Sequence, residues 1–317
     1  MIINHYEKKL KIFTGNANPQ LAADIAMHLG VELGKAEIGR FKDGEISIKI
    51  LETVRGAEVY IVQPTHKPTD THLMELLLMI DAMKRASAKM VAAVIPYYGY
   101  ARQDRKTQPR DCIGAKLVAN LLTAAGADRV VTMDLHADQI QGFFDIPVDN
   151  LRALPIIENY LRQKELSDLM VVAPDVGGVV RARALANRLN CPMAIVDKRR
   201  PAANVSQVMN IIGNVEGATC VLFDDMIDTG GTIVNAAEAL MKNGAKAVYA
   251  CCTHAVFSDN APIILQESPL TEVIATDTIN IPEERKFDKL RVLSVAELFA
   301  EAIRRIFMEQ PVSKLFD

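Results

Sequence analysis

The fold is decided by one stretch of the chain, Val221-Leu222-Phe223-Asp224-Asp225-Met226-Ile227-Asp228-Thr229-Gly230-Gly231-Thr232. Its three apolar residues are typical of a buried strand that stops at two acids, and the helix-like run 233–241 follows the glycines. In such a strand, loop and helix unit, the loop opens at the carboxyl end of a parallel strand, where α/β proteins bind their ligands. The stretch therefore predicts an α/β fold with a ligand site in this loop.

The side chains of this loop fit a phosphorylated sugar. Gly230 and Gly231 allow a close backbone approach to an anion, because no β-carbon is in the way. The hydroxyls of Thr229 and Thr232 add donors for phosphate oxygens, and the amides at the start of the following helix point toward the same anion. The two acids that end the strand repel phosphate, so we expect them about a sugar's length away, accepting hydrogen bonds from vicinal hydroxyls.

The alternative is a turn with a helix cap, in which one aspartate or threonine serves the first backbone amides of the helix. A cap needs one such residue, whereas residues 224–232 hold three aspartates, two threonines and two adjacent glycines. The run is not a Walker P-loop either, because it lacks the Lys-Ser/Thr pair after the last glycine. We therefore interpret it as a sugar phosphate site.

Strand-like runs alternate with helical patterns along the whole chain, which is typical of parallel sheets covered by helices. The turn-rich stretch Asp145–Asn150 separates two such series. We predict two similar domains, 1–150 and 151–317, each a mostly parallel sheet flanked by helices. The last helix, 295–308, could return to the first domain. Strands are expected at 10–13, 58–63, 89–96, 129–133, 169–173, 193–197, 219–223, 247–253 and 272–276.

Composition and charge exclude several classes of protein. A net charge of -3 disfavours duplex nucleic acid as a partner. The charged start of the chain lacks the apolar core of a signal peptide, and no apolar stretch approaches the ~20 residues that span a bilayer. The five cysteines lack CxxC or zinc-site spacing, and the pair Cys251-Cys252 is interpreted as core residues of a strand. We expect a cytoplasmic protein with no membrane segment.

A second motif, at 134–149, has the sequence Asp-Leu-His-Ala-Asp-Gln-Ile-Gln-Gly-Phe-Phe-Asp-Ile-Pro-Val-Asp. It resembles the signature of the ribose-phosphate pyrophosphokinase family, whose members are also called phosphoribosyl pyrophosphate synthetases. The loop at 224–232 is similar to the ribose 5-phosphate loop of the phosphoribosyltransferase superfamily, and the likeness to the synthetases extends over essentially the whole chain. The resemblance implies two domains of the type I phosphoribosyltransferase fold, the first for ATP and a regulatory loop and the second for ribose 5-phosphate.

The reaction implied by the resemblance is transfer of the β,γ-diphosphoryl group of Mg-ATP to the C1 hydroxyl of ribose 5-phosphate. The products are phosphoribosyl pyrophosphate and AMP, and the former supplies nucleotide, histidine and tryptophan biosynthesis. Positioning and neutralisation of charge can provide most of the catalysis in such a transfer. The resemblance also implies the residues that bind the sugar phosphate, which are Arg200, Asp224, Asp225, Asp228, Thr229, Gly230, Gly231 and Thr232.

Two loops that are ambiguous by themselves gain a role in ATP binding. Alone, the run 40–45 is a hairpin turn as often as a site, and the cation-rich run 97–106 either grips polyphosphate or forms a solvated loop. By resemblance, the first stacks on adenine and reaches the active site of a neighbouring subunit, and the second is a mobile ATP-binding loop. The implied ATP-binding residues are Phe41, Asp43, Gly44, Glu45, Arg102, Gln103 and His136.

A metal site is implied beside the second motif. Asp134 and His136 are two residues apart at a strand end, so their side chains share one face. Magnesium prefers oxygen ligands, which makes histidine an unusual choice, although bound water and ATP oxygens can fill most of the octahedron. The resemblance implies that His136 and Asp175 hold the Mg²⁺ that accompanies ATP, with Asp134 behind them.

The run Lys198-Arg199-Arg200 follows a predicted strand, and by itself it is typical of a solvated turn. By resemblance it begins a flexible catalytic loop, in which Lys198 and Arg200 are catalytic and neutralise the transferring phosphates. The resemblance further implies a homohexamer with ATP sites shared between subunits, activation by inorganic phosphate and inhibition by ADP. The segment 110–116, Arg-Asp-Cys-Ile-Gly-Ala-Lys, departs from the usual Arg-Glu-Pro-Ile-Ser/Thr-Ala-Lys of the family.

Two other functions remain as alternatives. A phosphoribosyltransferase has the same sugar phosphate loop but consumes phosphoribosyl pyrophosphate with a base, and the motifs at 41–45 and 134–136 argue against it. A noncatalytic regulatory homologue would bind nucleotide and partners only, and the presence of Lys198, Arg200, His136 and Asp175 argues against that. Formation of AMP from ATP and ribose 5-phosphate distinguishes all three.

Overall fold

A computed structural model describes residues 9–199 and 208–315 of the chain. The backbone forms two compact units. Unit 1 comprises Met1–Arg152, Thr278–Asn280 and Val295–Asp317, and unit 2 comprises Ala153–Asp277 and Ile281–Ser294. No helix in the described part of the chain combines the length and the apolar character needed to cross a membrane.

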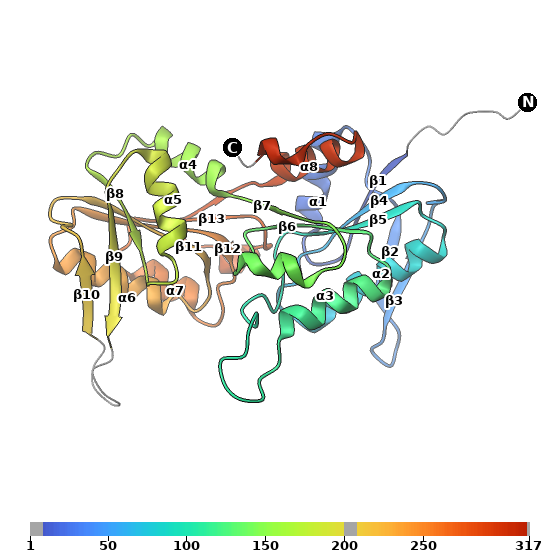
Figure 1. Ribbon diagram of the computed structural model, residues 1–317, viewed down its shortest axis with the longest axis horizontal. Helices are drawn as coiled ribbons and strands as arrows, with labels where there is room; N and C mark the ends of the chain where they lie inside the picture. The colour runs from blue at the N-terminus through green and yellow to red at the C-terminus, as the bar shows by residue number, and fades with distance from the viewer. Residues whose placement is uncertain (1–8, 200–207, 316–317) are drawn as a thin grey trace, which may run out of the picture. The chain divides into compact units, whose positions relative to one another are not determined.

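Unit 1 is built on a parallel sheet whose described strands follow the order β1-β4-β5-β6-β7. Figure 1 shows α1 and α8 on one side of this sheet and α2 and α3 on the other. The strands are β1 (Leu10–Thr14), β4 (Glu58–Val62), β5 (Met90–Ile95), β6 (Arg129–Met133) and β7 (Val148–Leu151). The helices are α1 (Pro19–Leu29), α2 (Thr69–Arg85), α3 (Gly114–Ala125), α8 (Ala296–Phe307) and the 3₁₀ turns η1 (Asp138–Phe143) and η3 (Val312–Leu315). An antiparallel hairpin of β2 (Ala36–Arg40) and β3 (Ile46–Ile50) stands apart from the sheet.

Unit 2 is built on a larger sheet, with the described order β10-β9-β8-β11-β12-β13-β14. All neighbours in it are parallel except the edge pair β10–β9. The strands are β8 (Leu169–Ala173), β9 (Met193–Arg199), β10 (Val208–Ile212), β11 (Thr219–Ile227), β12 (Ala247–Ala255), β13 (Glu272–Thr276) and β14 (Leu290–Leu293). The helices are α4 (Leu154–Gln163), α5 (Val179–Leu189), α6 (Gly231–Lys242), α7 (Ala261–Glu267) and the 3₁₀ turn η2 (Glu283–Arg285).

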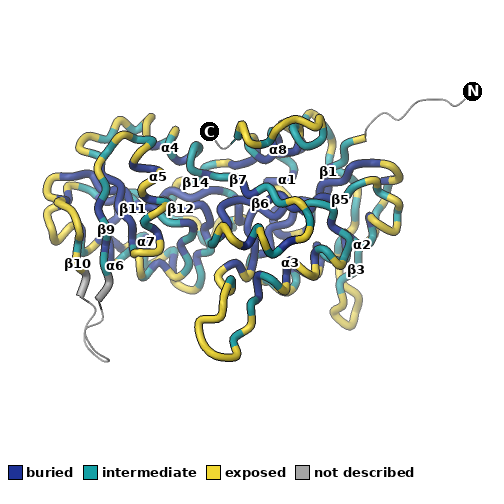
Figure 2. Tube along the Cα trace, viewed as in Figure 1, coloured by how far each residue is buried: buried dark blue, intermediate teal, exposed yellow. Residues whose placement is uncertain are grey.

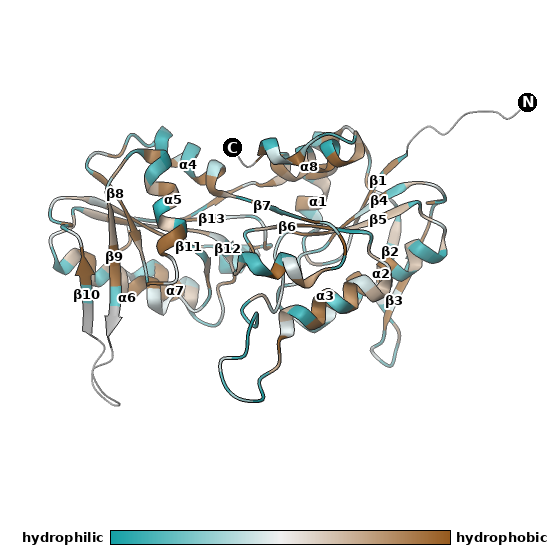
Figure 3. Cartoon of the chain, in the orientation of Figure 1, coloured by the Kyte–Doolittle hydropathy of each residue, from teal (hydrophilic) through white to brown (hydrophobic). Residues whose placement is uncertain are grey.

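Burial explains why these runs form strands. The central strands β4 and β5 consist almost wholly of buried residues, as parallel strands covered on both faces require (Figure 2). Apolar residues concentrate along the strands and on the helix faces that cover them (Figure 3). Cys251 and Cys252 lie fully buried in β12, and burial raises the pKa of both thiols. Each unit therefore has its own apolar core.

The two sheets share one order of strands. In unit 1, an isolated parallel bridge between Ile12 and Leu33 adds one more position beside β1. The order from that bridge is then Leu33, β1, β4, β5, β6, β7, and unit 2 repeats it as β9, β8, β11, β12, β13, β14. By this correspondence, β8 matches β1 and β11 matches β4. The predicted fold class, α/β with two similar and mostly parallel domains, is confirmed.

The structure differs from the sequence-based expectation at the sheet edges. The stretch Asp145–Asn150, predicted as turn, includes the first three residues of β7, which pairs in parallel with β6. The strands β10 and β14, which were not predicted, are also the last strands of their sheet. An edge strand packs fewer apolar residues than a central one, so its sequence lacks the continuous apolar run that identifies a buried strand.

The C-terminal helix α8 belongs to unit 1, where it packs on α1. Its buried face carries Phe299 and Ile303, both completely inaccessible to solvent. Arg304 adds a hydrogen bond from Nη2 to the carbonyl oxygen of His28, at 2.8 Å. The end of the chain is thus part of the core that its first helix needs.

We predict that Phe299→Ala destabilises the protein by about 3–5 kcal/mol, because it removes a fully buried aromatic side chain and leaves a cavity. Urea denaturation followed by circular dichroism measures the change. The control is Met27→Ala on α1, where the side chain is 67% exposed and the expected change is within about 0.5 kcal/mol. Equal, small effects of both substitutions would contradict the packing of α8 described above.

Candidate functional site

The loop after β11 forms a strand, loop and helix unit. Asp224 and Asp225 still belong to β11, which continues to Ile227 in parallel pairing with β12. Gly230 has a φ of +80°, and a β-carbon there would also approach Ile264 to 3.3 Å, so glycine suits this position. A β-carbon on Gly231 would meet no atom within 4 Å. The turn therefore leaves open space at the start of α6, where helix amides attract anions.

The two acids at the end of β11 form a carboxylate pair in which Asp225 is buried and Asp224 is half-buried. Asp225 is 2% exposed, and its backbone N–H donates to Asp224 Oδ1 at 2.9 Å. Burial and the neighbouring charge of Asp225 raise the pKa of Asp224 to about 7. Near neutral pH the pair therefore exchanges a proton readily, and hydroxyl donors that bind it would favour the ionised form.

Arg181, in the first turn of α5, balances this pair. Its Nη1 lies 3.1 Å from Asp225 Oδ1 and 3.3 Å from Asp224 Oδ1, and its charge lowers the pKa of Asp224, against the larger effect of burial. Helix α5 follows the loop after β8, the strand next to β11. The start of α5 and the end of β11 thus meet at the carboxyl edge of one sheet, as expected for a ligand crevice.

The same β8 loop holds Asp175, the predicted metal ligand. Its Oδ1 accepts a hydrogen bond from the backbone N–H of Gly178 at 3.1 Å, which fixes the carboxylate at the head of α5. Among the described residues, no three His, Cys, Asp or Glu side chains gather into a metal site. The two predicted donors, one imidazole (His136) and one carboxylate (Asp175), would make up two of the six ligands that Mg²⁺ takes. This donor set fits an ion that keeps water and substrate oxygens, and it does not fit a cage made by the protein.

His136 follows β6 in unit 1, within a charged turn. Asp134, just before it, has a φ of +40°, and its carboxylate lies 3.5 Å from Arg152 Nη1. The other nitrogen, Arg152 Nη2, lies 2.7 Å from Asp138 Oδ1. Asn150 fixes the backbone by accepting from the N–H of Leu135 at 3.1 Å. These contacts hold the turn that presents His136, which is half-buried.

The run 40–45 is the tip of the β2–β3 hairpin. The N–H of Phe41 donates to the carbonyl oxygen of Glu45 at 2.8 Å, and Asp43 Oδ1 accepts from the N–H of Glu45 at 3.1 Å. Gly44 has a φ of +94°, as a tight turn requires. The ring of Phe41 is 58% exposed. The segment is thus a hairpin, and it also offers an aromatic face to a partner in solution.

The loop with Arg102 and Gln103 leads from β5 to α3, and both residues are exposed. Its start is anchored by Tyr98, whose hydroxyl donates to the carbonyl oxygen of Ala115 at 2.9 Å. Its next turn is tied to η1 by Gln139 Nε2, which donates to Asp104 Oδ2 at 2.9 Å. Exposed polar side chains on an anchored loop are suited to bind a polar ligand.

The structure describes only one of the two predicted catalytic residues. Lys198 lies near the end of β9, with its backbone paired to Met209 of β10. Arg200 lies outside the described residues. The structure therefore provides the backbone position of Lys198 and leaves the catalytic roles of both residues as predictions.

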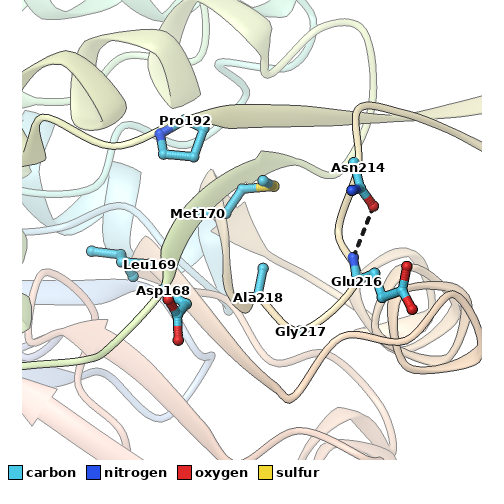
Figure 4. Close-up of a pocket in the computed structure, with 8 residues that line it drawn as sticks. All are labelled: Asp168, Leu169, Met170, Pro192, Asn214, Glu216, Gly217 and Ala218. Carbon is cyan, nitrogen blue, oxygen red and sulfur yellow. Dashed lines mark hydrogen bonds between the residues drawn. The ribbon is translucent and has the colours of Figure 1, made fainter.

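A pocket of about 590 Å³ lies at the opposite, amino edge of the unit 2 sheet (Figure 4). It opens between the starts of β8, β9 and β11, where Asn214 Oδ1 accepts from the N–H of Glu216 at 3.2 Å. Its described lining includes Asp168 and Glu216 and no lysine or arginine. A phosphorylated ligand would be repelled there, so the loop at the carboxyl edge is the better candidate.

Sequence reasoning missed Arg181 and Arg152. Arg181 lies six residues after Asp175, and Arg152 directly follows β7, the strand that pairs with β6 before Asp134. A search for cations to balance the predicted acids could have found both, because buried carboxylates need a counter-charge. Their particular partners depend on which strands are neighbours, and single motifs do not contain that information.

The fold and the loop define a doubly wound α/β protein with a candidate anion site at a helix start on the carboxyl edge of its sheet. A model for the N-terminal domain of ribose phosphate pyrophosphokinase matches residues 10–126, and one for the phosphoribosyl synthetase-associated domain matches residues 178–317. Ribose-phosphate pyrophosphokinase of Caldanaerobacter subterraneus subsp. tengcongensis is 62% identical over 98% of this chain and 99% of that relative. The Clostridium tetani relative of the same name is 59% identical, with both chains fully covered.

The solved structure of phosphoribosylpyrophosphate synthetase from Mycobacterium smegmatis agrees with these matches. It superimposes with a TM-score of 0.91 and 45% identity, over 95% of this chain and 100% of that chain. The chain belongs to the ribose-phosphate pyrophosphokinase family. The family predicted from the motifs is therefore confirmed.

We predict that Arg181→Met raises the pKa of Asp224 above its present value of about 7, because the opposing charge is lost. If ribose hydroxyls need the ionised carboxylate, the affinity for ribose 5-phosphate falls as the pH drops through about 7, and this midpoint moves to higher pH in the variant. Calorimetric titrations between about pH 5.5 and 9 measure the midpoint.

Asp224→Asn is the control for that titration, because it removes the titration of Asp224. The raised pKa also affects stability. The folded protein holds this proton more tightly than the unfolded chain, so the contribution is fully present below about pH 4 and is lost as the pH rises through about 7. An unchanged midpoint in Arg181→Met would contradict the role of Arg181.

Proposed function

We propose that this chain, as a ribose-phosphate pyrophosphokinase, converts ATP and ribose 5-phosphate into AMP and phosphoribosyl pyrophosphate. The observation that carries the proposal is the loop at 224–232, which combines a carboxylate pair, with Asp225 buried and Asp224 half-buried, with an open helix start. The carboxylates suit the hydroxyls of a sugar, and the helix start suits its phosphate. Family membership over the whole chain supports the same reaction.

Ribose 5-phosphate is bound by unit 2 in this proposal. Asp224 and Asp225 accept hydrogen bonds from the vicinal hydroxyls of the ribose, with Arg181 balancing their charge. The 5-phosphate occupies the open space at Gly231, where backbone amides and the hydroxyls of Thr229 and Thr232 donate to it. Asp228 holds this turn, because its carbonyl oxygen accepts from the N–H of Ser258 at 3.0 Å.

ATP is bound by residues of unit 1. The exposed ring of Phe41 stacks on the adenine, and Asp43 and Glu45 accept hydrogen bonds from its exocyclic amine. Arg102 and Gln103 contact the rest of the nucleotide. The hairpin that carries Phe41 also holds Gly44, whose positive φ shapes its tip.

The reaction is an in-line displacement at the β-phosphorus. The oxygen of the C1 hydroxyl forms a bond to that phosphorus, its proton is lost, and the bond to the α-phosphate oxygen breaks, so that AMP leaves. The protein supplies position and charge. The acid pair fixes the sugar ring and thereby aims the C1 hydroxyl, and the cations Lys198 and Arg200 neutralise the transferring phosphates.

Magnesium would enter with ATP and be held by His136 and Asp175. Two protein donors suit an ion that retains its other ligands from water and the phosphate oxygens. When bound, it would neutralise charge on the diphosphoryl group. Asp134 keeps the turn before His136 in place through Arg152.

We also propose a cytoplasmic homohexamer with an adenine site shared across a subunit interface and with inorganic phosphate as activator. The exposed Phe41 at the end of a hairpin supports a contact with another subunit, because a large aromatic side chain in water gains free energy when it is covered. Light scattering coupled to size exclusion chromatography measures the assembly.

The test of the function is AMP formation. Purified protein with ATP, magnesium, phosphate and ribose 5-phosphate is expected to release AMP and phosphoribosyl pyrophosphate in equal amounts, measured by ³¹P NMR. Release of ADP, or absence of AMP under these conditions, would contradict the proposal.

Lys198→Ala is predicted to lower kcat by about 10²- to 10³-fold while the KM for ribose 5-phosphate changes little, because a cation that stabilises developing charge acts mainly in the transition state. The coupled AMP assay gives both constants. Circular dichroism and the melting temperature establish that the variant is folded. Turnover at the wild-type rate by a folded variant would show that Lys198 has no catalytic role.

A further inference from the structure

Two of the departures from the family pattern in segment 110–116, Cys112 and Gly114, lie against Gln103 in the structure. The backbone N–H of Ala115 donates to the carbonyl oxygen of Gln103 at 3.2 Å. The thiol of Cys112 donates to Gln103 Oε1 at 3.4 Å. The side chain of Gln103 also lies directly against Gly114, the first residue of α3.

Gly114 leaves room for that side chain. A β-carbon at this position would lie 2.4 Å from Gln103 Oε1, far inside van der Waals contact. Its next neighbours would be the Cδ and Cβ atoms of Gln103, at 3.2 and 3.3 Å, so Nε2 is further away than all three. The oxygen end of the amide therefore faces the glycine and the thiol, and the NH₂ end lies further from Gly114.

This orientation is favourable for physical reasons. The amide oxygen lies at the amino terminus of α3, where the helix dipole favours negative charge. A thiol donor adds a weak hydrogen bond to the same oxygen. The NH₂ group remains as a donor for an acceptor atom outside the loop, and phosphate, ribose and adenine ring atoms are all acceptors.

We propose that Gly114, assisted by Cys112, is a positioning residue that orients Gln103 so that its NH₂ group donates to ATP. The inference rests on the proposed function, because it takes Gln103 as an ATP-binding residue. It concerns this chain in particular. A serine or threonine at 114 has the β-carbon that would collide with Oε1, and a proline at 112 has no thiol to donate.

Gly114→Ala separates this role from a structural one. The atom that the new β-carbon meets is the end of a flexible exposed side chain, which can rotate away without disturbing the fold. Alanine is also the better helix former at the start of α3, so the variant should be at least as stable as the wild type. A loss of ATP affinity in a protein of equal or higher stability is then attributable to Gln103.

The expected result is a KM for ATP that rises about 3- to 10-fold in Gly114→Ala, the range of one hydrogen bond, with kcat within about twofold. Gln103→Ala should raise the KM similarly, and the double variant should add nothing further, because Gly114 acts through Gln103. Cys112→Ala should raise the KM by a smaller factor, and Cys112→Ser, which keeps a donor, should restore it.

The control is Asn120→Ala, an exposed position of α3 where alanine raises helix propensity without approaching Gln103. It should keep the wild-type KM. The Kd of ATP with magnesium, measured by calorimetry without ribose 5-phosphate, should follow the KM values. The inference is wrong if Gly114→Ala binds ATP with the wild-type Kd. It is also wrong if Gly114→Ala raises the Kd in the Gln103→Ala background as much as it does in the wild type. If the wild type forms no AMP, the proposed function is wrong but the inference is still tested. The Kd of ATP for the wild type and the variants then still shows whether Gly114 acts through Gln103.

Discussion

The contact of Arg181 with Asp224 and Asp225 is the constraint on which the sugar site depends. Two carboxylates at the buried end of a strand repel each other and lose hydration, and this raises the pKa of Asp224 to about 7. The guanidinium of Arg181, at the start of α5, opposes this shift and lowers the pKa of Asp224. Hydrogen bonds donated by the hydroxyls of a bound ribose can stabilise the ionised pair further. The acid pair is therefore costly to stability in the free protein and useful when the sugar binds.

The shared strand order raises the question of why the equivalent loops of unit 1 need not bind a second sugar phosphate. There, the loop after β1 and the residue after β4 are occupied by the carboxylate of Glu75. It accepts from Asn16 N at 3.2 Å, Asn16 Nδ2 at 2.9 Å and Gln63 Nε2 at 2.8 Å. The fully buried Gln63 in turn accepts from the N–H of Ala17 at 3.0 Å. The side chain of Glu75 thus satisfies these donors, and the equivalent loops of the two units differ in chemistry although their sheets share one strand order.

The α/β fold class and the position of the candidate sugar site could be predicted from the sequence. The reason is that the central parallel strands are continuous apolar runs and the loop at 224–232 has a distinctive composition. The family was predicted from the motif at 134–149 together with the segments at 41–45 and 198–200. The edge strand β7 was not predicted, because Pro147 and Asp149 interrupt the apolar pattern that identifies a strand. The partners of Arg181 and the fit of Gly114 to Gln103 depend on contacts between distant segments, which periodicity does not encode. The roles of Lys198, Arg200 and the other site residues remain predictions.

The central claim is that the acid pair holds the ribose hydroxyls while the helix start holds the phosphate. Calorimetry with ribose 5-phosphate and 2-deoxyribose 5-phosphate, on the wild type and on Asp224→Asn, tests it most directly. The deoxy sugar should bind the wild type about tenfold or more weakly, because a buried carboxylate oxygen loses its donor. In Asp224→Asn the difference should shrink to about threefold or less. Equal affinities of the two sugars for the wild type would contradict the account.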